Sequence, residues 1–167
     1  MPVTQVEATA ALKPDHVYII PPNRGLRISD DEVSAHEFDE PRGRRAPINL
    51  FFRSLADQHG DGFAVILTGA GSDGAVGVKA VKKAGGIILV QDPSEAEYPS
   101  MPRSAIATGV ADFILPVREI ASRVAELARN KETVISHLRD SIRIFPPDLS
   151  SREERERESR EPAASRT

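Results

Sequence analysis

The chain has 167 residues, of which 40 % are hydrophobic and 28 % are charged, a balance typical of a globular domain with one buried core. Its formal net charge of -3 gives no electrostatic reason to expect a nucleic acid or an anionic membrane as a partner. Cysteine is absent, which excludes disulfides and thiolate metal sites, and we expect neither a metal nor a cofactor.

Nothing in the chain has the pattern of a membrane or export segment. No apolar run approaches the roughly 20 residues that cross a bilayer. Residues 1–11 have neither the basic start nor the apolar stretch of a signal peptide. We therefore expect a cytoplasmic protein without membrane insertion.

The first predicted elements are strands. Residues 16–20 are β-branched and aromatic, which predicts a short strand that ends at Pro21-Pro22. Residues 26–29 and 33–36 predict a small hairpin, and a polar, basic loop follows it over residues 39–45.

The middle of the chain predicts a βαβ unit. Pro47 begins a segment with apolar residues at helical spacing, which ends at Gly60. Residues 63–67 form a continuous apolar run, typical of a strand buried on both faces. A glycine-rich turn, residues 68–74, a short helix and a second buried strand, residues 87–90, come next. The two strands are therefore expected to be parallel neighbours.

The last part of the chain divides into ordered and charged segments. Pro102 to Thr108 predicts a short helix and residues 113–115 a brief strand. Residues 117–129 predict an amphipathic helix, continued by a second one over residues 132–144. The charge-rich, apolar-poor end predicts disorder. We expect a main domain over residues 1–129, a helical extension over residues 130–149 and a disordered tail over residues 150–167.

The glycine-rich turn is the candidate functional site, because open α/β sheets bind ligands where a parallel strand ends and a helix begins. Gly69-x-Gly71-x-x-Gly74 matches the dinucleotide fingerprint, and Asp92 stands about 20 residues further on, where a ribose-binding acid is expected. The carboxylate of Asp73 argues against this hypothesis, because it would repel a bound pyrophosphate.

A second interpretation of the same turn is a nucleophile elbow. Residues 70–74 nearly match G-x-S-x-G, with alanine in place of the first glycine. Ser72, then Asp92 or Asp112, then His137 would supply the chain order Ser, Asp, His. His137 lies in a polar helical segment, which argues against it.

A third interpretation makes Asp73 itself the functional group. Backbone N–H groups in such a turn hold a carboxylate ionised, and an oriented carboxylate can accept a histidine N–H as the acid of a Ser-His-Asp triad does. The structural alternative is that Asp73 only caps a helix.

Five segments in order resemble one family. Residues 66–77, ILTGAGSDGAVG, are similar to the signature ILTGMGxDGAxG of CheB-type protein-glutamate methylesterases. Four further segments agree in order and spacing: VYIIPPN at 17–23, PINLFFRSL at 47–55, GGIILVQD at 85–92 and MPRSAIATG at 101–109. The segments PPNRGLRIS at 21–29 and PRGRRAPINLFFRSLA at 41–56 are most similar to the variant that is fused to a receptor methyltransferase domain.

This resemblance, over roughly residues 14–126, implies a doubly wound, mostly parallel α/β sheet. It also implies a carboxylic ester hydrolase that removes glutamyl methyl esters from the cytoplasmic region of methyl-accepting chemoreceptors in chemotaxis. It assigns the triad acid to Asp73. It assigns the oxyanion hole to a backbone N–H near Ala70 in the turn with Gly71. Ala70 replaces the usual methionine, but a backbone donor does not depend on the side chain.

The resemblance also suggests weaker substrate contacts. Met101 and Arg103 belong to the family's MPR motif, and Tyr98 stands where the family often has an aromatic residue near the rim. Arg103 is a candidate contact for an acidic receptor helix, with a structural hydrogen bond as the alternative.

Two members of the triad have no counterpart in these residues. The family's nucleophile and its base both precede the segment that matches Val17, and the sixteen residues before Val17 contain no serine. Gln58-His59 resembles the family's Gln-His motif, but it lies at the end of a helix. We therefore expect an N-terminally truncated, catalytically impaired domain. The alternatives are completion by a chain that supplies the missing strands, and a non-catalytic remnant that binds receptors or a partner.

Overall fold

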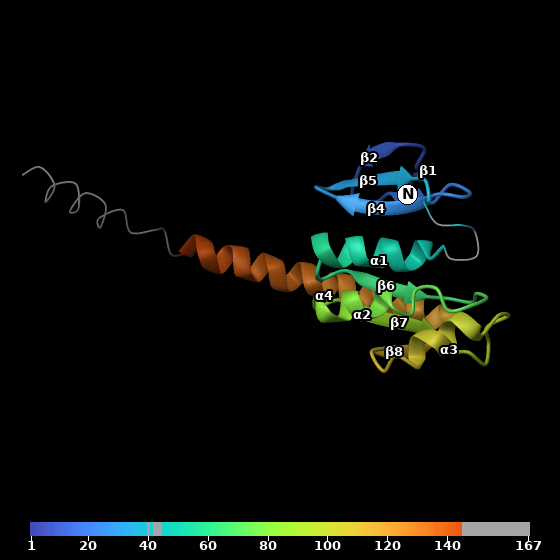
Figure 1. The fold of residues 1–167 in the computed structure, drawn as a ribbon. Helices are drawn as coiled ribbons and strands as arrows, with labels where there is room; N and C mark the ends of the chain where they lie inside the picture. The colour runs from blue at the N-terminus through green and yellow to red at the C-terminus, as the bar shows by residue number, and fades with distance from the viewer. Residues whose placement is uncertain (40, 42–44, 145–167) are drawn as a thin grey trace, which may run out of the picture. The chain divides into compact units, whose positions relative to one another are not determined.

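The computed structural model describes residues 1–39, 41 and 45–144, with side chains as far as Lys131. Strands dominate the first part and a strand–helix alternation follows (Figure 1). The elements in chain order are β1 (Val3–Gln5), β2 (Thr9–Ala11), β3 (Val17–Ile19), β4 (Gly25–Ser29), β5 (Glu32–His36), α1 (Pro47–Gln58), β6 (Phe63–Ile66), α2 (Gly77–Lys83), β7 (Ile87–Gln91), α3 (Ser100–Ile106), β8 (Phe113–Leu115) and α4 (Val117–Ile144).

A parallel sheet forms the centre of the α/β part. Its strand order is β6-β7-β8, and both pairs are parallel. β7 lies in the middle, and Ile88, Leu89 and Val90 are completely buried there. This confirms the predicted α/β fold class and the parallel pairing of the two strands that flank the glycine turn.

An antiparallel sheet is built on the predicted hairpin. β4 pairs with β5 across Asp30 and Asp31, whose φ angles of 50° and 61° are both positive. Two successive positive φ angles are what a tight hairpin with right-twisted strands requires. β2 extends this sheet beside β5, and β1 pairs in parallel with β3. The sequence patterns did not predict β1 or β2.

Helix α1 packs against both β4 and α2 (Figure 1). The buried Ser54 joins it to β4, because its hydroxyl accepts the Ile28 N–H at 3.0 Å and donates to the Phe51 carbonyl at 2.8 Å. On the other side, a Cβ atom added at Gly77 would lie only 2.7 Å from the Cβ of Phe52. A glycine therefore allows α2 to approach α1 this closely.

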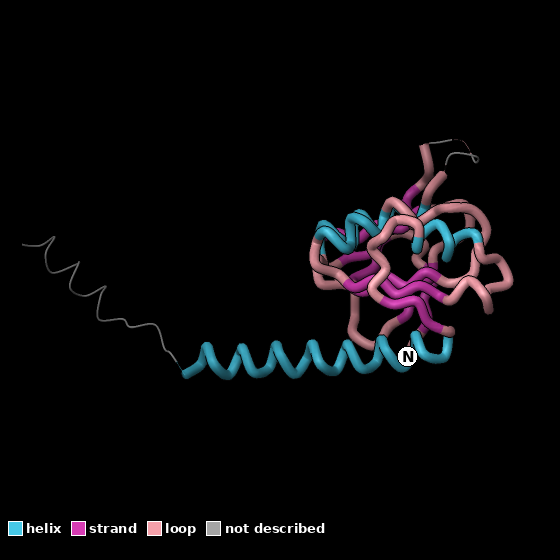
Figure 2. The backbone as a smooth tube through the Cα atoms, turned by 90° about the horizontal axis from the view of Figure 1, so that it is seen from below, coloured by secondary structure: helices cyan, strands magenta, loops and turns pink. Residues whose placement is uncertain are grey.

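The chain divides into two compact units, residues 1–124 and residues 125–167. α4 is one continuous helix that runs through this boundary, where the sequence predicted a helix and its continuation (Figure 2). The predicted boundaries at residues 129 and 149 remain predictions, and the charged tail lies outside the described residues. In the part of the chain that the structure describes, no helix is long and apolar enough to cross a membrane.

Candidate functional site

The glycine turn begins directly after β6 and leads into α2. Gly71 and Gly74 have φ angles of +88° and +91°, a conformation that side-chain-bearing residues rarely adopt. Gly74 is also crowded, since a Cβ atom there would lie 3.0 Å from side-chain carbons of both Ile48 and Ile66. The two glycines therefore fix the path of the turn and the direction of Asp73 between them.

The half-buried Asp73 carboxylate is held by three backbone N–H groups. Oδ2 accepts the Ile48 N–H at 2.9 Å, and Oδ1 accepts the N–H groups of Asn49 at 3.0 Å and Gly74 at 2.8 Å. Two of these donors belong to the first turn of α1, so Asp73 caps a helix distant in sequence. A carboxylate offers about four lone-pair sites. One site, on Oδ2, stays available for a further donor.

Asn49 makes the reciprocal connection. Its Oδ1 accepts the N–H groups of Val76 at 3.1 Å and Gly77 at 2.7 Å, at the start of α2. Each helix thus receives its N-terminal acceptor from the other segment. The first amides of a helix have no partner within the helix. The Asp73–Asn49 exchange satisfies four of them, and it locks the turn against α1.

This exchange leaves little room for a nucleotide phosphate. In a dinucleotide site the free amides at the helix start bind the pyrophosphate. Here the Val76 and Gly77 amides already donate to Asn49. The pKa of Asp92 is lowered by the Ser94 N–H, which donates to its Oδ1 at 2.8 Å. These contacts do not favour the dinucleotide hypothesis.

The elbow hypothesis is not supported by the described contacts either. Ser72 is exposed, and no described residue accepts its hydroxyl. Asp112 binds Lys82 and the Ile88 N–H instead. The His137 side chain lies outside the described part. His59 lies beside the hairpin turn, with Nε2 3.8 Å from Asp31 Oδ1, rather than at Asp73.

The two expected oxyanion residues differ in their hydrogen bonding. The Gly71 N–H donates to the Ser100 hydroxyl at 3.0 Å, and that hydroxyl donates to the Gly69 carbonyl at 3.2 Å. Within the described residues the exposed Ala70 N–H donates to no acceptor. Ala70 therefore has the backbone donor that a ligand can use, and Gly71 shapes the turn.

The structure brings two of the three expected contact residues to this turn. The Gly69 N–H donates to the Tyr98 carbonyl at 2.9 Å, and the Tyr98 N–H donates to the Thr68 hydroxyl at 2.8 Å. The Met101 sulfur covers Gly69 so closely that a Cβ atom there would overlap it. Arg103 lies further along α3 with an exposed side chain, and no described contact joins it to the turn.

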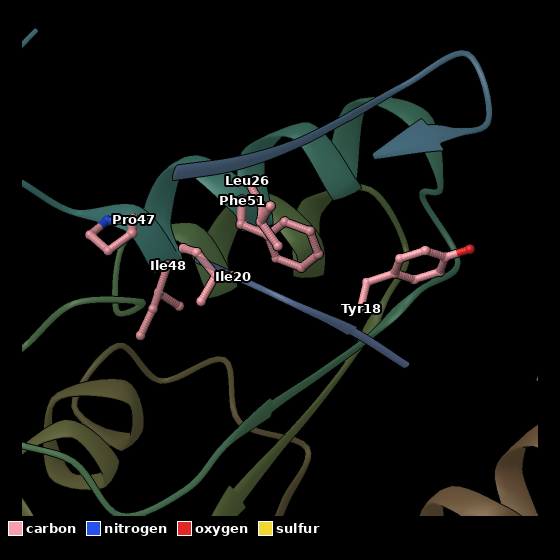
Figure 3. Close-up of a pocket in the computed structure, with 6 residues that line it drawn as sticks. All are labelled: Tyr18, Ile20, Leu26, Pro47, Ile48 and Phe51. Atoms are coloured by element: carbon pink, nitrogen blue, oxygen red, sulfur yellow. The ribbon is translucent and has the colours of Figure 1, made fainter. Parts of the chain in front are cut away.

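An apolar pocket of about 430 Å³ lies beside the start of α1, and Ile48, which lines it, also donates its N–H to Asp73 Oδ2. Figure 3 shows the apolar side chains together, while the Tyr18 hydroxyl points away from them to bind the Ala11 carbonyl at 2.8 Å. The lining residues are Tyr18, Ile20, Leu26, Pro47, Ile48 and Phe51. The described residues contain no cluster of metal-ligating side chains.

The sequence patterns did not indicate the roles of Asn49, Ser100 or Gln91. Gln91 Oε1 accepts the Thr68 N–H at 2.7 Å and so supports the start of the turn. No periodicity marks such residues, since their partners are distant in the chain.

The sequence model of the CheB methylesterase family matches residues 1–124. The chain is 42 % identical over 130 residues to the uncharacterized 104.1 kDa protein of the hypE 3′ region of Rhodobacter capsulatus, covering 75 % of this chain and 13 % of that protein. It is 36 % identical over 122 residues to the protein-glutamate methylesterase/protein-glutamine glutaminase of group 3 operon of Rhizobium meliloti, covering 72 % and 34 %.

A solved structure from the CheB methylesterase family is also similar to this chain. The catalytic domain of CheB methylesterase from Thermotoga maritima matches with a TM-score of 0.65 and 32 % identity, covering 74 % of this chain and 68 % of that one. The chain thus spans about a third or less of the length of the two relatives named above.

Proposed function

This chain belongs to the CheB methylesterase family, and on that premise we propose that it supplies the acid and the oxyanion donor of a protein-glutamate methylesterase site. The observation that supports this proposal most is the hydrogen bonding of the Asp73 carboxylate. Its carboxylate is fixed in direction by three backbone N–H groups and keeps one acceptor site on Oδ2. A carboxylate held in this way can orient a histidine and stabilise its protonated form.

The Ala70 N–H is proposed as the oxyanion donor. It lies three residues before Asp73 in the same turn, and no described residue accepts its hydrogen. A donor fixed in advance at the place where negative charge develops contributes about 3–4 kcal/mol to catalysis. Tyr98 and Met101 would then contact the substrate beside it, since both are held at Gly69. Arg103 is a weaker candidate for contact with an acidic segment.

The nucleophile and the base are proposed to come from a segment outside these residues. Neither Ser72 nor a described histidine side chain bonds to Asp73. We therefore expect very weak hydrolysis by these 167 residues alone, because a triad without nucleophile or base retains only residual catalysis. A segment of the same polypeptide or of a second chain would have to place a serine and a histidine at Oδ2.

The proposed substrate is a glutamyl methyl ester on the cytoplasmic region of a methyl-accepting chemoreceptor, and the reaction would then take place in the cytoplasm. The name of the Rhizobium meliloti relative also includes a glutaminase. A glutamine amide would use the same carboxylate and oxyanion donor. The alternative function is binding of the receptor, or of a partner, without hydrolysis.

Methanol release from a methylated receptor fragment tests the proposal. The chain is assayed alone and together with a polypeptide that contains the family's serine and histidine segments. We expect release only in the mixture, and a loss of at least 100-fold with Asp73→Asn. Asp57→Asn removes the same charge from an exposed position of α1 and should have no effect.

Each possible outcome is informative. Release by the chain alone would contradict the proposed absence of nucleophile and base. Release in the mixture that survives Asp73→Asn would contradict the role of Asp73. Binding of the receptor fragment without release in any mixture would favour the non-catalytic alternative.

A further inference from the structure

Four consecutive backbone amides begin the glycine turn, and three of them already have an acceptor. The N–H groups of Thr68, Gly69 and Gly71 donate at 2.7, 2.9 and 3.0 Å to the Gln91 side-chain amide, the Tyr98 carbonyl and the Ser100 hydroxyl, respectively. Within the described residues the Ala70 N–H, which lies between the bonded amides, donates to no acceptor. Among these four amides, one is thus available to a ligand, and its direction depends on how its neighbours are held.

The three acceptors come from two different parts of the fold. Tyr98 and Ser100 belong to the segment that leads into α3, and this segment is bonded to the turn in both directions, since the Tyr98 N–H donates to the Thr68 hydroxyl at 2.8 Å. Gln91 is instead the last residue of β7, the middle strand of the parallel sheet. Gln91 is therefore the acceptor that ties these amides to the sheet.

The Gln91 side chain takes over where the pairing of β6 with β7 ends. The last paired residues are Ile66 and Val90. The next amide on this side of β6, that of Thr68, donates to the Gln91 side chain rather than to a strand carbonyl. The glutamine thus extends the ladder by one bond, while the backbone leaves the sheet to form the turn. Because Gln91 is only 5 % exposed, water is a poor substitute for this acceptor.

The orientation of the Gln91 amide is fixed by its two neighbours. Its Nε2 donates to Glu95 Oε1 at 3.1 Å, and the same oxygen accepts the Val117 N–H, at the start of α4, at 2.6 Å. A backbone N–H only donates and a carboxylate only accepts, so a reversed side-chain amide would lose both of its bonds. Glu95 therefore keeps the side-chain oxygen of Gln91 directed at Thr68.

We propose that Gln91, oriented by Glu95, is a positioning residue for the oxyanion donor at Ala70. The inference rests on the proposed function, because it concerns the same donor. Peptide groups are planar, so the direction of one N–H follows from the path of the chain on both sides. Gln91 fixes this path at Thr68 on the β6 side, and the Asp73 carboxylate fixes it on the α2 side. A donor that is held in advance favours the transition state over the bound substrate.

Hydrogen exchange of single amides, measured by NMR on the whole chain, tests the inference without any catalysis. Gln91→Met keeps the length of the side chain but removes the acceptor of the Thr68 N–H. We expect this amide to exchange at least about tenfold faster and the Ala70 signal to shift, while the Ile88 amide in the middle of β7 keeps its rate.

The double variant Gln91→Glu/Glu95→Gln is the rescue. A carboxylate oxygen at position 91 accepts the Thr68 N–H, and a side-chain amide at position 95 donates to that carboxylate while its oxygen accepts the Val117 N–H. The charge of the pair is unchanged. We therefore expect exchange of the Thr68 amide within about threefold of the native rate.

Catalysis gives the second readout, in the mixture that releases methanol. Gln91→Met should lower kcat roughly tenfold and leave KM within about twofold, because an oxyanion donor acts mainly in the transition state. The double variant should restore kcat. Gln5→Met makes the same replacement at an exposed position of β1 and should leave both constants unchanged.

Three results would overturn the inference. The first is an equal rise of exchange at Thr68 and Ile88, since Gln91→Met would then only weaken the whole fold. The second is an unchanged kcat in Gln91→Met, and the third is a double variant that restores neither exchange nor kcat. If no mixture releases methanol, the proposed function fails, while the exchange rates still decide whether Gln91 holds the turn. The two proposals are thus tested separately.

Discussion

The two parallel sheets of this molecule differ sharply in how they are covered. In the sheet β6-β7-β8, the middle strand is buried on both faces, and α2 and α3 both contact β6 and β7. In the sheet β1-β3, no strand residue is buried, and Val3, Val17 and Ile19 are 60 %, 37 % and 46 % exposed. Apolar strand surface of this kind is uncommon unless another element covers it.

The comparison teaches where the stability of residues 1–124 resides. Burial of apolar area stabilises the β6-β7-β8 region, whereas among the residues of β1 and β3 only Tyr18 packs against a buried apolar cluster, that of Val6, Leu26 and Val33. The Asp73–Asn49 exchange belongs to the β6-β7-β8 region, because it joins α1 to the turn that follows β6.

The largest effect is expected from Ile88→Ala in β7. Ile88 is completely buried, and its truncation leaves a cavity that costs about 3 kcal/mol of unfolding free energy. The matched variant Ile19→Ala in β3 should cost less than ~1 kcal/mol, because its side chain is 46 % exposed. Urea unfolding measures both. Equal losses would contradict the contrast between the sheets.

A somewhat smaller effect is expected from Asp73→Ala. It removes the acceptor of the first α1 amides, and the loss of such a charged cap costs about 2 kcal/mol. Asp57→Asn, on the exposed side of α1, should stay within ~0.5 kcal/mol. If Asp73→Ala unfolds no more easily than this control, the carboxylate does not cap α1.

Asn49→Ala should cost about 1 kcal/mol, because the Val76 and Gly77 amides then lose their acceptor. Asn49→Asp keeps an oxygen in this place and should cost less than the alanine variant. The double variant Asp73→Ala/Asn49→Ala should deviate from the sum of the two losses, because both residues join the same two segments. Strict additivity in chemical denaturation would argue against a joint role.

The smallest effect is expected at Asp92. The Ser94 N–H lowers its pKa below the ordinary value of 3.8, so the carboxylate stabilises the fold above pH 3.8. This contribution is lost as the pH falls through the lowered pKa. In Asp92→Asn the stability should depend slightly less on pH just below 3.8, as thermal unfolding between pH 5 and 2.5 would show. An unchanged slope would contradict the hydrogen bond.

The sequence by itself determined the elements with strong local signals. The apolar runs of β6 and β7, the proline that begins α1 and the glycines of the turn predicted the βαβ unit. The ordered motifs identified the family and singled out Asp73. These signals are local, because side-chain type limits the backbone at each position. The pairing of β1 with β3 and of β2 with β5 was not predicted, since three-residue strands leave no periodicity to detect.

Only the tertiary structure decided what Asp73 binds. Residue type offered a helix cap or a triad acid as alternatives. The fold brings the start of α1 to the carboxylate, 24 and 25 residues distant in sequence, while one acceptor site remains. It likewise decided that the Ala70 N–H stays available while Gly71 donates to Ser100, and that the Gln91 side chain meets Thr68. Such contacts follow from long-range packing, and neither spacing nor composition encodes which distant groups will meet.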